Sequence, residues 1–239
     1  MNSGNQNVRR PLPLRPSSLR EQVRDTIRRQ IQHGEIGRDD RLVDVDIAER
    51  LGVSRMPVRE ALLQLVNEGY LVGTTRGFVL PKLSLRDITD IFEIRKLLEP
   101  RAAAHATRNL SHEAEASLLA AVQRAERAQT VGDVDELTLA NIQFRQTWLA
   151  AEPNWRLAAT ISRFADQVQT VRLGTLHDPD TQKIVLDGLK QLLDAFVRRD
   201  ATQVEALMAE FIGHAEARFF AVRAKEIAES ETETARLAT

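Results

Sequence analysis

The sequence predicts a mainly α-helical protein, in which a winged helix-turn-helix domain of three helices and a two-stranded wing precedes an all-α helical bundle. Ala, Leu and Arg are plentiful and aromatic residues make up only 5% of the chain, which favours packed helices over sheet. Short helical patterns and one strand-like hairpin, separated by glycines, occupy residues 17–80. From residue 84 onward the apolar residues recur with a helical period, and no later stretch alternates like a strand.

The first three predicted helices are short, and each ends at or near a glycine. The first spans about 17–33, with apolar residues at four-residue steps along one face and a serine as its cap. The second spans about 44–51. Ser54 caps the third, over 54–69, and Pro57 lies in its first turn, where a missing N–H costs nothing.

A hairpin and a long helical region follow. Residues 70–72 and 78–80 are apolar and flank a glycine-containing turn at 73–77, which predicts two short strands. Pro81 ends this unit. Flanking segments lack such patterns, so we expect a disordered arm over 1–16 and a polar, frayed tail over 229–239 around a helical domain at 84–228. Its helices are predicted near 84–107, 112–130, 133–150, 154–176 (broken), 181–198 and 200–228.

Composition and charge narrow the function classes. The chain has no cysteine, which removes disulfides, thiolate metal sites and a cysteine nucleophile, and suits a reducing, cytoplasmic location. No apolar run approaches the length of a membrane span. Residues 1–82 hold 14 Lys and Arg against 10 Asp and Glu, a net charge of +4, whereas the other 157 residues hold 19 against 24, a net charge of −5. A basic N-terminal third on an acidic remainder suits local contact with phosphates.

The third helix and the wing carry the pattern typical of DNA recognition. Arg55 at the start of the helix can fork onto guanine, and Arg59 lies one turn later on the same face. Ser54 and the free N–H groups of the first turn suit a phosphate oxygen. Arg76 and Gly77 at the hairpin tip can approach the minor groove. The alternative is a structural three-helix unit whose arginines only face solvent.

Residues 47–69, I-A-E-R-L-G-V-S-R-M-P-V-R-E-A-L-L-Q-L-V-N-E-G, resemble the N-terminal signature of the GntR family of bacterial regulators. One departure is Arg38-Asp39, where that family usually has Pro-Gly. The resemblance implies double-stranded DNA as a partner. It implies DNA contacts at Ser54, Arg55, Met56, Pro57, Arg59, Arg76 and Gly77.

The helical region is similar to the all-helical ligand-binding domain, called FCD, of the FadR branch of that family. The segments that carry this looser similarity are 91–103, 141–145 and 192–200. Many members of the branch hold a divalent metal with one Asp and three His. The corresponding positions here are Asn141, Arg145, Leu189 and Phe211. Asn is a poor metal ligand and the others are not ligands, so we predict no metal and no other cofactor. A one-turn slip would bring His214 to the last position and restore one ligand.

Three arginines lean inward on three predicted helices. Arg95, Arg145 and Arg172 share faces with apolar residues, and a buried charge without a partner costs several kcal/mol. One resolution is a small anionic effector held by guanidinium forks. The other is internal pairing with carboxylates or extension of the arginines to the surface. The candidate carboxylates are Glu93, Glu99 and Asp166, and the candidate effector-binding residues are Arg95, Asn141, Arg145, Arg172 and His214.

These features together predict a cytoplasmic, homodimeric transcription regulator. A twofold-symmetric dimer implies an inverted-repeat operator, and the inward arginines favour a small carboxylate-type metabolite as effector. The resemblance implies that the effector relieves repression. Two alternatives stay open: a DNA-binding dimer without an effector, and a metal-dependent sensor. A helical enzyme with a DNA-binding appendage has no support, because the sequence shows no nucleophile–base spacing and no cofactor motif.

Overall fold

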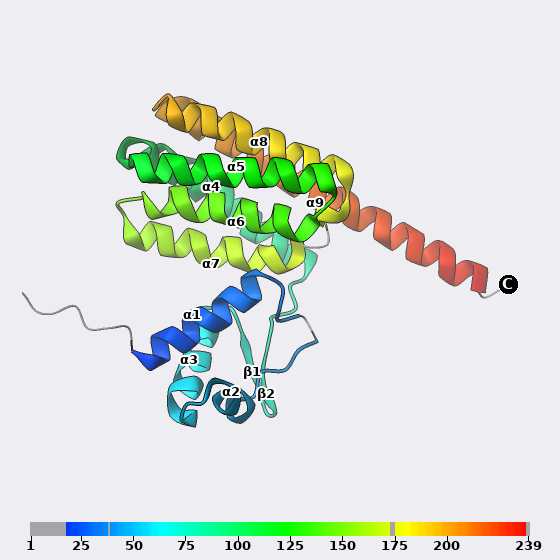
Figure 1. The fold of residues 1–239 in the computed structure, drawn as a ribbon. Coiled ribbons are helices and arrows are strands. Elements are labelled where there is room, and N and C mark those ends of the chain that lie inside the picture. The colour runs from blue at the N-terminus through cyan, green and yellow to red at the C-terminus, as the bar shows by residue number, and fades with distance from the viewer. Residues whose placement is uncertain (1–17, 38, 173–174, 238–239) are drawn as a thin grey trace, which may run out of the picture.

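The structure is a computed structural model that describes residues 18–37, 39–172 and 175–237, with side chains left undescribed at 169–172 and 225–237. An N-terminal domain of three helices and a hairpin precedes a C-terminal bundle of longer helices (Figure 1), so the predicted fold class is confirmed. The predicted arm over 1–16 lies outside the described residues. The elements are α1 (Leu19–Gln32), α2 (Asp44–Leu51), α3 (Arg55–Asn67), β1 (Val72–Thr74), β2 (Gly77–Val79), α4 (Leu85–Asn109), α5 (His112–Val131), α6 (Val134–Ala150), α7 (Trp155–Arg172), a 3₁₀ turn (Thr175–His177), α8 (Pro179–Val197) and α9 (Ala201–Leu237).

Local signals set the ends of the first three helices. Ser18 and Glu21 form a reciprocal capping box at the start of α1. Gly52, with φ of 65°, ends α2 in the left-handed conformation that glycine adopts without strain. Apolar side chains of α3, among them Val58 and Leu62, are fully buried against α1, and form a core separate from that of the bundle.

The wing is tighter than predicted. Its strands pair from Val72–Val79 to Thr74–Gly77, so the turn is only two residues long. Tyr70 and Leu71, which the sequence predicts in the first strand, lie before it and are buried in the domain core. Their apolar character therefore reflects core packing, whereas the strand itself is exposed on both faces.

The second strand is also tied to the loop that precedes α2. Leu42 and Phe78 exchange two backbone hydrogen bonds of 2.8 Å each. Gly77 makes this approach possible, because a Cβ there would lie 2.6 Å from the carbonyl oxygen of Leu42, and its φ is 131°. This glycine therefore has a role within the protein that sequence reasoning did not identify: it lets two backbone segments come close to each other. Its approach to DNA stays a prediction.

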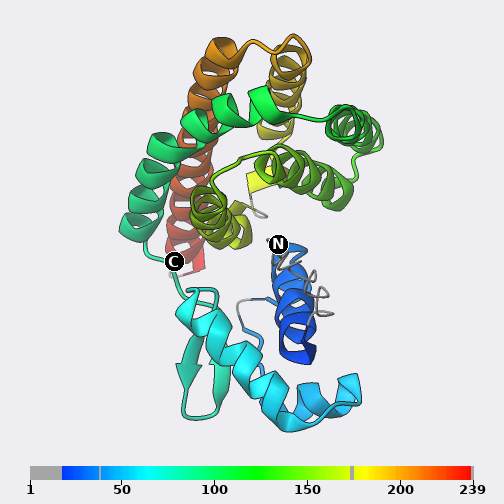
Figure 2. The same ribbon diagram turned by 90° about the vertical axis from the view of Figure 1, so that its left-hand side faces the viewer.

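The C-terminal domain is a bundle in which α4 packs against α9, and α5 against α6 and α8. Figure 2 shows α4 and α9 along their length and α5 close to end on, with the N-terminal domain below the bundle. The core of the bundle contains the large buried rings of Phe92, Phe144, Trp148, Phe196 and Phe219. In the region predicted as a broken helix over 154–176, α7 is described to Arg172 and the 3₁₀ turn begins at Thr175, and the two residues between them lie outside the described set. None of the described helices combines the length and apolarity that a bilayer crossing requires.

The last helix is longer than predicted. The apolar period weakens after 228, but α9 continues to Leu237, and its last turns extend away from the bundle (Figure 1). The segment predicted as a frayed polar tail is thus helical through Leu237.

The N-cap of α8 gives a first testable prediction. Asp178 accepts hydrogen bonds from the N–H and the hydroxyl of Thr181 and pairs with Arg218 of α9. The Thr181 hydroxyl and Arg218 lower the pKa of Asp178 from 3.8 to about 2, against the opposing effect of burial. Asn caps a helix as well as Asp does, so Asp178→Asn removes only the negative charge at the helix start and the ion pair with Arg218. The substitution should therefore lower the free energy of unfolding at neutral pH by roughly 0.3–1 kcal/mol.

A depressed pKa in the folded state stabilises the protein above the unfolded-state value, about 3.9 for Asp, and that contribution disappears as pH falls through the folded value. The difference between wild type and Asp178→Asn should hence shrink from pH 5 to pH 2 by roughly the full effect. Thermal unfolding across this range measures it. Asp187→Asn, an exposed change on the same helix, serves as the control. A pH-independent difference would contradict the assignment.

Candidate nucleic-acid interface and ligand cavity

One face of α3 presents two arginines and a methionine to solvent. Arg55 occupies the first position of the helix and Arg59 follows one turn later. The side chains of Arg55 and Arg59 are 57% and 52% exposed, and Met56 is 61% exposed. Three residues predicted to contact DNA thus lie together on one open helical surface.

A buried carboxylate beneath this surface orients both arginines. Asp44, the first residue of α2, accepts from Arg55 Nε at 3.0 Å and from Arg59 Nη1 at 3.4 Å. Burial acts to raise the pKa of Asp44, but the hydrogen bond and charge of Arg55 outweigh it and the pKa is lowered. Sequence reasoning missed Asp44, although an acid at the start of the preceding helix was the available signal. Because Asp44 binds Nε, the terminal nitrogens of Arg55 are left to face outward.

The remaining predicted contacts lie around α3 and at the wing tip. Ser54 is the N-cap residue by its backbone conformation, but its hydroxyl makes no capping hydrogen bond, so it is available to a phosphate. Pro57 is partly buried in the first turn. Arg76 is exposed at the wing tip, with its N–H donated to the Thr74 hydroxyl, and the tip points away from the bundle (Figure 2).

Three of the residues predicted to bind an effector converge in the bundle. Arg95 of α4 and Asn141 and Arg145 of α6 line one cavity of about 20 Å³, walled by the rings of Trp148 and Phe211. This volume holds roughly one water molecule. All three polar side chains are at most 7% exposed, so the cavity is an interior site.

Both arginines of the cavity form ion pairs with carboxylates of the protein, which is one of the two predicted alternatives. Arg95 donates through Nε and Nη2 to Glu99, and Arg145 Nη2 donates to Asp166 at 2.9 Å. The third candidate carboxylate, Glu93, lies exposed on α4. Burial, opposed by the charge of Asp166, lowers the pKa of Arg145.

Two donors in this cavity nevertheless have no partner. Arg95 Nη1 and Asn141 Nδ2 are buried without a hydrogen bond among the described residues. Arg28 of α1 also binds Asp166, so three guanidinium groups share the charges of two carboxylates. Together these five side chains carry one excess positive charge, although Arg28 lies outside the cavity. This charge and the unused donors favour an anion or another hydrogen-bond acceptor.

One predicted effector residue, His214, does not line this cavity, and another, Arg172, has a side chain outside the described set. His214 lines a separate cavity of about 230 Å³ between α8 and α9. The ring of Phe211 lines both cavities, and it packs so closely on Gly188 that a Cβ there would lie 2.3 Å from the ring. Arg172 lies in the last turn of α7, where side chains are outside the described set.

The four positions aligned with metal ligands do come together. Asn141, Arg145, Leu189 and Phe211 all line the small cavity. An amide, a guanidinium and two hydrocarbon side chains do not fit a divalent cation, because the guanidinium repels it and the hydrocarbons offer no lone pair. Across the described residues, no three His, Asp or Glu side chains are grouped to hold a metal ion.

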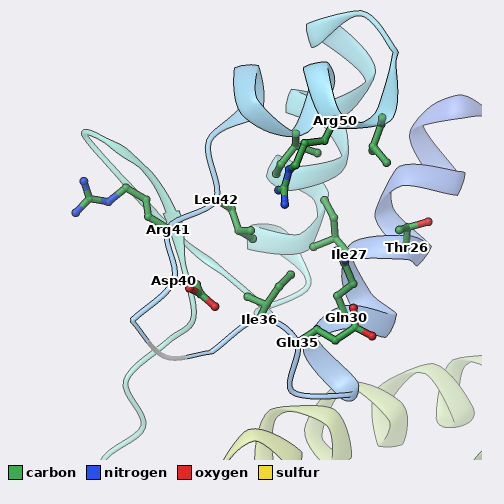
Figure 3. Close-up of a pocket in the computed structure, with 11 residues that line it drawn as sticks. Thr26, Ile27, Gln30, Glu35, Ile36, Asp40, Arg41, Leu42 and Arg50 are labelled. Atoms are coloured by element: carbon green, nitrogen blue, oxygen red, sulfur yellow. The ribbon is translucent and has the colours of Figure 1, made fainter.

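A further cavity of about 430 Å³ lies in the N-terminal domain, between α1, α2 and the loop before α2 (Figure 3). Glu35 and Asp40 balance Arg41 and Arg50 around it, and Arg41 points away from its centre. The buried atoms without partners lie elsewhere among the described residues. This cavity lacks the excess charge and unused donors that distinguish the smaller one.

Comparisons with known proteins agree with both domains. Residues 19–77 match the family described as bacterial regulatory proteins, gntR family, and residues 90–214, more than half of the chain, match the FCD domain. The HTH-type transcriptional regulator McbR of Escherichia coli K12 is 36% identical over 129 residues, which cover 54% of this chain and 58% of McbR. The HTH-type transcriptional repressor RspR of the same strain is 26% identical over 84% of this chain and 87% of its own length. The solved structure of E. coli McbR/YncC superposes with a TM-score of 0.73 at 27% identity, over 87% of this chain and all of that one.

Proposed function

The chain belongs to the GntR family of bacterial regulatory proteins and carries an FCD domain, and on that premise we propose that it is a DNA-binding transcription regulator controlled by a small anionic effector. The observation that carries the DNA-binding part is the pair of exposed arginines on α3, both held from below by Asp44. A guanidinium fixed through one nitrogen loses less conformational freedom when its other nitrogens bind a base.

The effector part rests on the unused donors of the small cavity. Arg95 Nη1 and Asn141 Nδ2 face a volume with excess positive charge, so a ligand carrying a carboxylate would satisfy both. The Arg145 guanidinium supplies the positive charge at a position where related domains place a metal, so binding is metal-independent. Because the cavity is small, the ligand enters by displacing the Phe211 ring toward the larger cavity that holds His214.

We further propose that the protein acts in the cytoplasm as a homodimer on inverted half-sites, and that the effector relieves repression. The name of the relative RspR, a transcriptional repressor, supports repression as the mode of action. A ligand changes DNA binding only if it binds one arrangement of the domains better than another.

A thermal-shift screen tests the effector directly. The panel consists of small mono- and dicarboxylates, nucleobase catabolites and acyl-CoA thioesters, each with and without EDTA. A carboxylate shift that EDTA does not change supports the metal-free site. No shift from any compound would support a DNA-binding dimer without an effector, and a large EDTA effect would support a metal-dependent sensor.

Asn141→Ala provides the residue-level test of the cavity. The substitution removes an unpartnered donor, so we expect little loss of thermal stability but a roughly 2- to 13-fold weaker affinity for the carboxylate identified, as one hydrogen bond is worth about 0.5–1.5 kcal/mol. Isothermal titration measures the affinity. Asn109→Ala, on the exposed end of α4, is the matched control. Unchanged affinity in Asn141→Ala would place the ligand elsewhere.

A further inference from the structure

A single carboxylate on α7 is hydrogen-bonded to the N-terminal domain from three directions. Asp166 has a side chain only 1% exposed. Its Oδ2 accepts from Arg28 Nη2 at 2.8 Å, from Gln32 Nε2 at 2.8 Å and from the Tyr70 hydroxyl at 2.9 Å. Burial, together with the charge of Asp166, raises the pKa of Tyr70, so the phenol remains a neutral donor.

The other oxygen of Asp166 binds a residue that lines the ligand cavity. Oδ1 accepts from Arg145 Nη2 at 2.9 Å, and Arg145 is one of the cavity's lining residues. We call Arg28, Gln32, Tyr70, Arg145 and Asp166 the Asp166 cluster. In this cluster the Asp166 carboxylate lies between the Arg145 guanidinium at the cavity and α1, which packs in the core of the DNA-binding domain.

The rest of this boundary is also polar. Gln167 Nε2 donates to the carbonyl of Gly69 at 2.8 Å, and Gln146 Nε2 donates to Gln32 at 3.4 Å. The buried apolar residues of the two domains form two separate cores. Hydrogen bonds between domains exchange with water at little net cost, so this boundary is able to open.

We propose that Asp166 is a positioning residue that couples occupancy of the cavity to the placement of the DNA-binding domain. The inference rests on the proposed effector. An anion that binds Arg145 competes with Asp166 for the guanidinium, and Asp166 then remains buried with less compensating charge. Separation of α1 from α7 returns water to this carboxylate. The effector therefore favours the separated arrangement, and by linkage DNA that requires the closed arrangement weakens effector binding.

The test needs no effector, because Arg145→Gln mimics a guanidinium engaged elsewhere. Since the chain has no cysteine, Glu49→Cys in α2 and Gln123→Cys in α5, both exposed, allow two spin labels on the full chain. Pulsed electron paramagnetic resonance then gives the distribution of distances between the two labels, and hence between the domains. Dilution of labelled chain in unlabelled chain suppresses distances between different chains. Arg145→Gln and Asp166→Asn should each raise the ratio of molecules with separated domains to molecules with closed domains. The expected increase is roughly 5- to 150-fold, the range that ordinary coupling free energies give.

Controls separate coupling from damage to the fold. Asp90→Asn removes an exposed carboxylate from α4 and should leave the distribution unchanged. If Asp166→Asn does not fold by circular dichroism, Tyr70→Phe removes one donor from the cluster and should shift the distances in the same direction by a smaller amount.

A double-mutant cycle supplies a readout that a purely structural role would not move. Arg28 and Arg145 both bind Asp166, on different oxygens, so Arg28→Gln and Arg145→Gln should be non-additive with Asp166 present and additive in Asp166→Asn. Unchanged distances in all variants, or additivity in both backgrounds, would overturn the proposal. Failure of the carboxylate screen would instead remove the effector and leave these ligand-free distances standing.

Discussion

Arg55→Ala is expected to abolish most of the protein's discrimination at one base pair of its operator. The exposed guanidinium at the start of α3 is placed to fork onto guanine, and loss of such a contact costs roughly 1–3 kcal/mol, or about 5- to 150-fold in affinity for the correct site. Random DNA should lose much less, because it offers Arg55 no defined base. An operator is first selected in vitro with the wild-type protein. Titrations at fixed salt then measure the affinities of both proteins for this operator and for random DNA.

The salt dependence distinguishes a base contact from a phosphate contact. If Arg55 bound a phosphate, the substitution would reduce the salt slope by about 1 and weaken all sequences alike, which would contradict the assignment. Arg108→Ala makes the same change of charge at the far end of α4 and should leave both affinities unaltered.

Glu99→Gln is expected to give the largest loss of stability. Glu99 and Arg95 form an ion pair with side chains 2% and 3% exposed. Removal of one charge leaves the other buried and unpaired, at a cost of roughly 3–5 kcal/mol. At roughly 2–4 °C per kcal/mol for a protein of this size, calorimetry should show the unfolding temperature of the C-terminal domain falling by about 6–20 °C.

Replacement of both Arg95 and Glu99 should, in contrast, cost little stability. Arg95→Met with Glu99→Leu substitutes apolar side chains of similar volume, which is often neutral for stability. We expect recovery of most of the unfolding temperature together with loss of the carboxylate response. Glu93→Gln, exposed on the same helix, should change stability by less than about 0.5 kcal/mol. If the double variant remained as unstable as Glu99→Gln, the pair would be structural rather than retained for a ligand.

Local patterns were sufficient to predict the elements of this fold but not all of their ends. Helix periods, serine caps and glycines give α1 to α8 to within a few residues, because these signals act within one or two turns, whereas α9 runs nine residues past its predicted end at 228. The wing was shifted because Tyr70 and Leu71 look like strand residues, yet Tyr70 is placed by a hydrogen bond to Asp166, far away in the sequence. Contacts across such separations leave no periodic trace in a single sequence.

The candidate sites follow the same division. Arg55, Arg59 and the inward faces of Arg95 and Arg145 follow from helical geometry, and the structure places them accordingly. The role of Asp44 and the N-terminal donors to Asp166 depend on how helices pack, which spacing alone does not specify. For the same reason the sequence does not show that His214, three residues after Phe211, lines the larger cavity while Phe211 lines both.

The two hydrogen bonds between Leu42 and Phe78 bear on how the protein measures an operator. They anchor the wing to the segment that leads into α2, and Asp44 ties α2 to the arginines of α3. We therefore expect the offset between a wing contact and an α3 contact on DNA to be constant within each proposed half-site. In the dimer that we propose, we expect tolerance for different spacer lengths to come from the polar boundary at Asp166, where the DNA-binding domain is proposed to separate from the bundle. A base pair inserted between half-sites would be accommodated there, whereas one inserted within a half-site would put its two contacts out of phase.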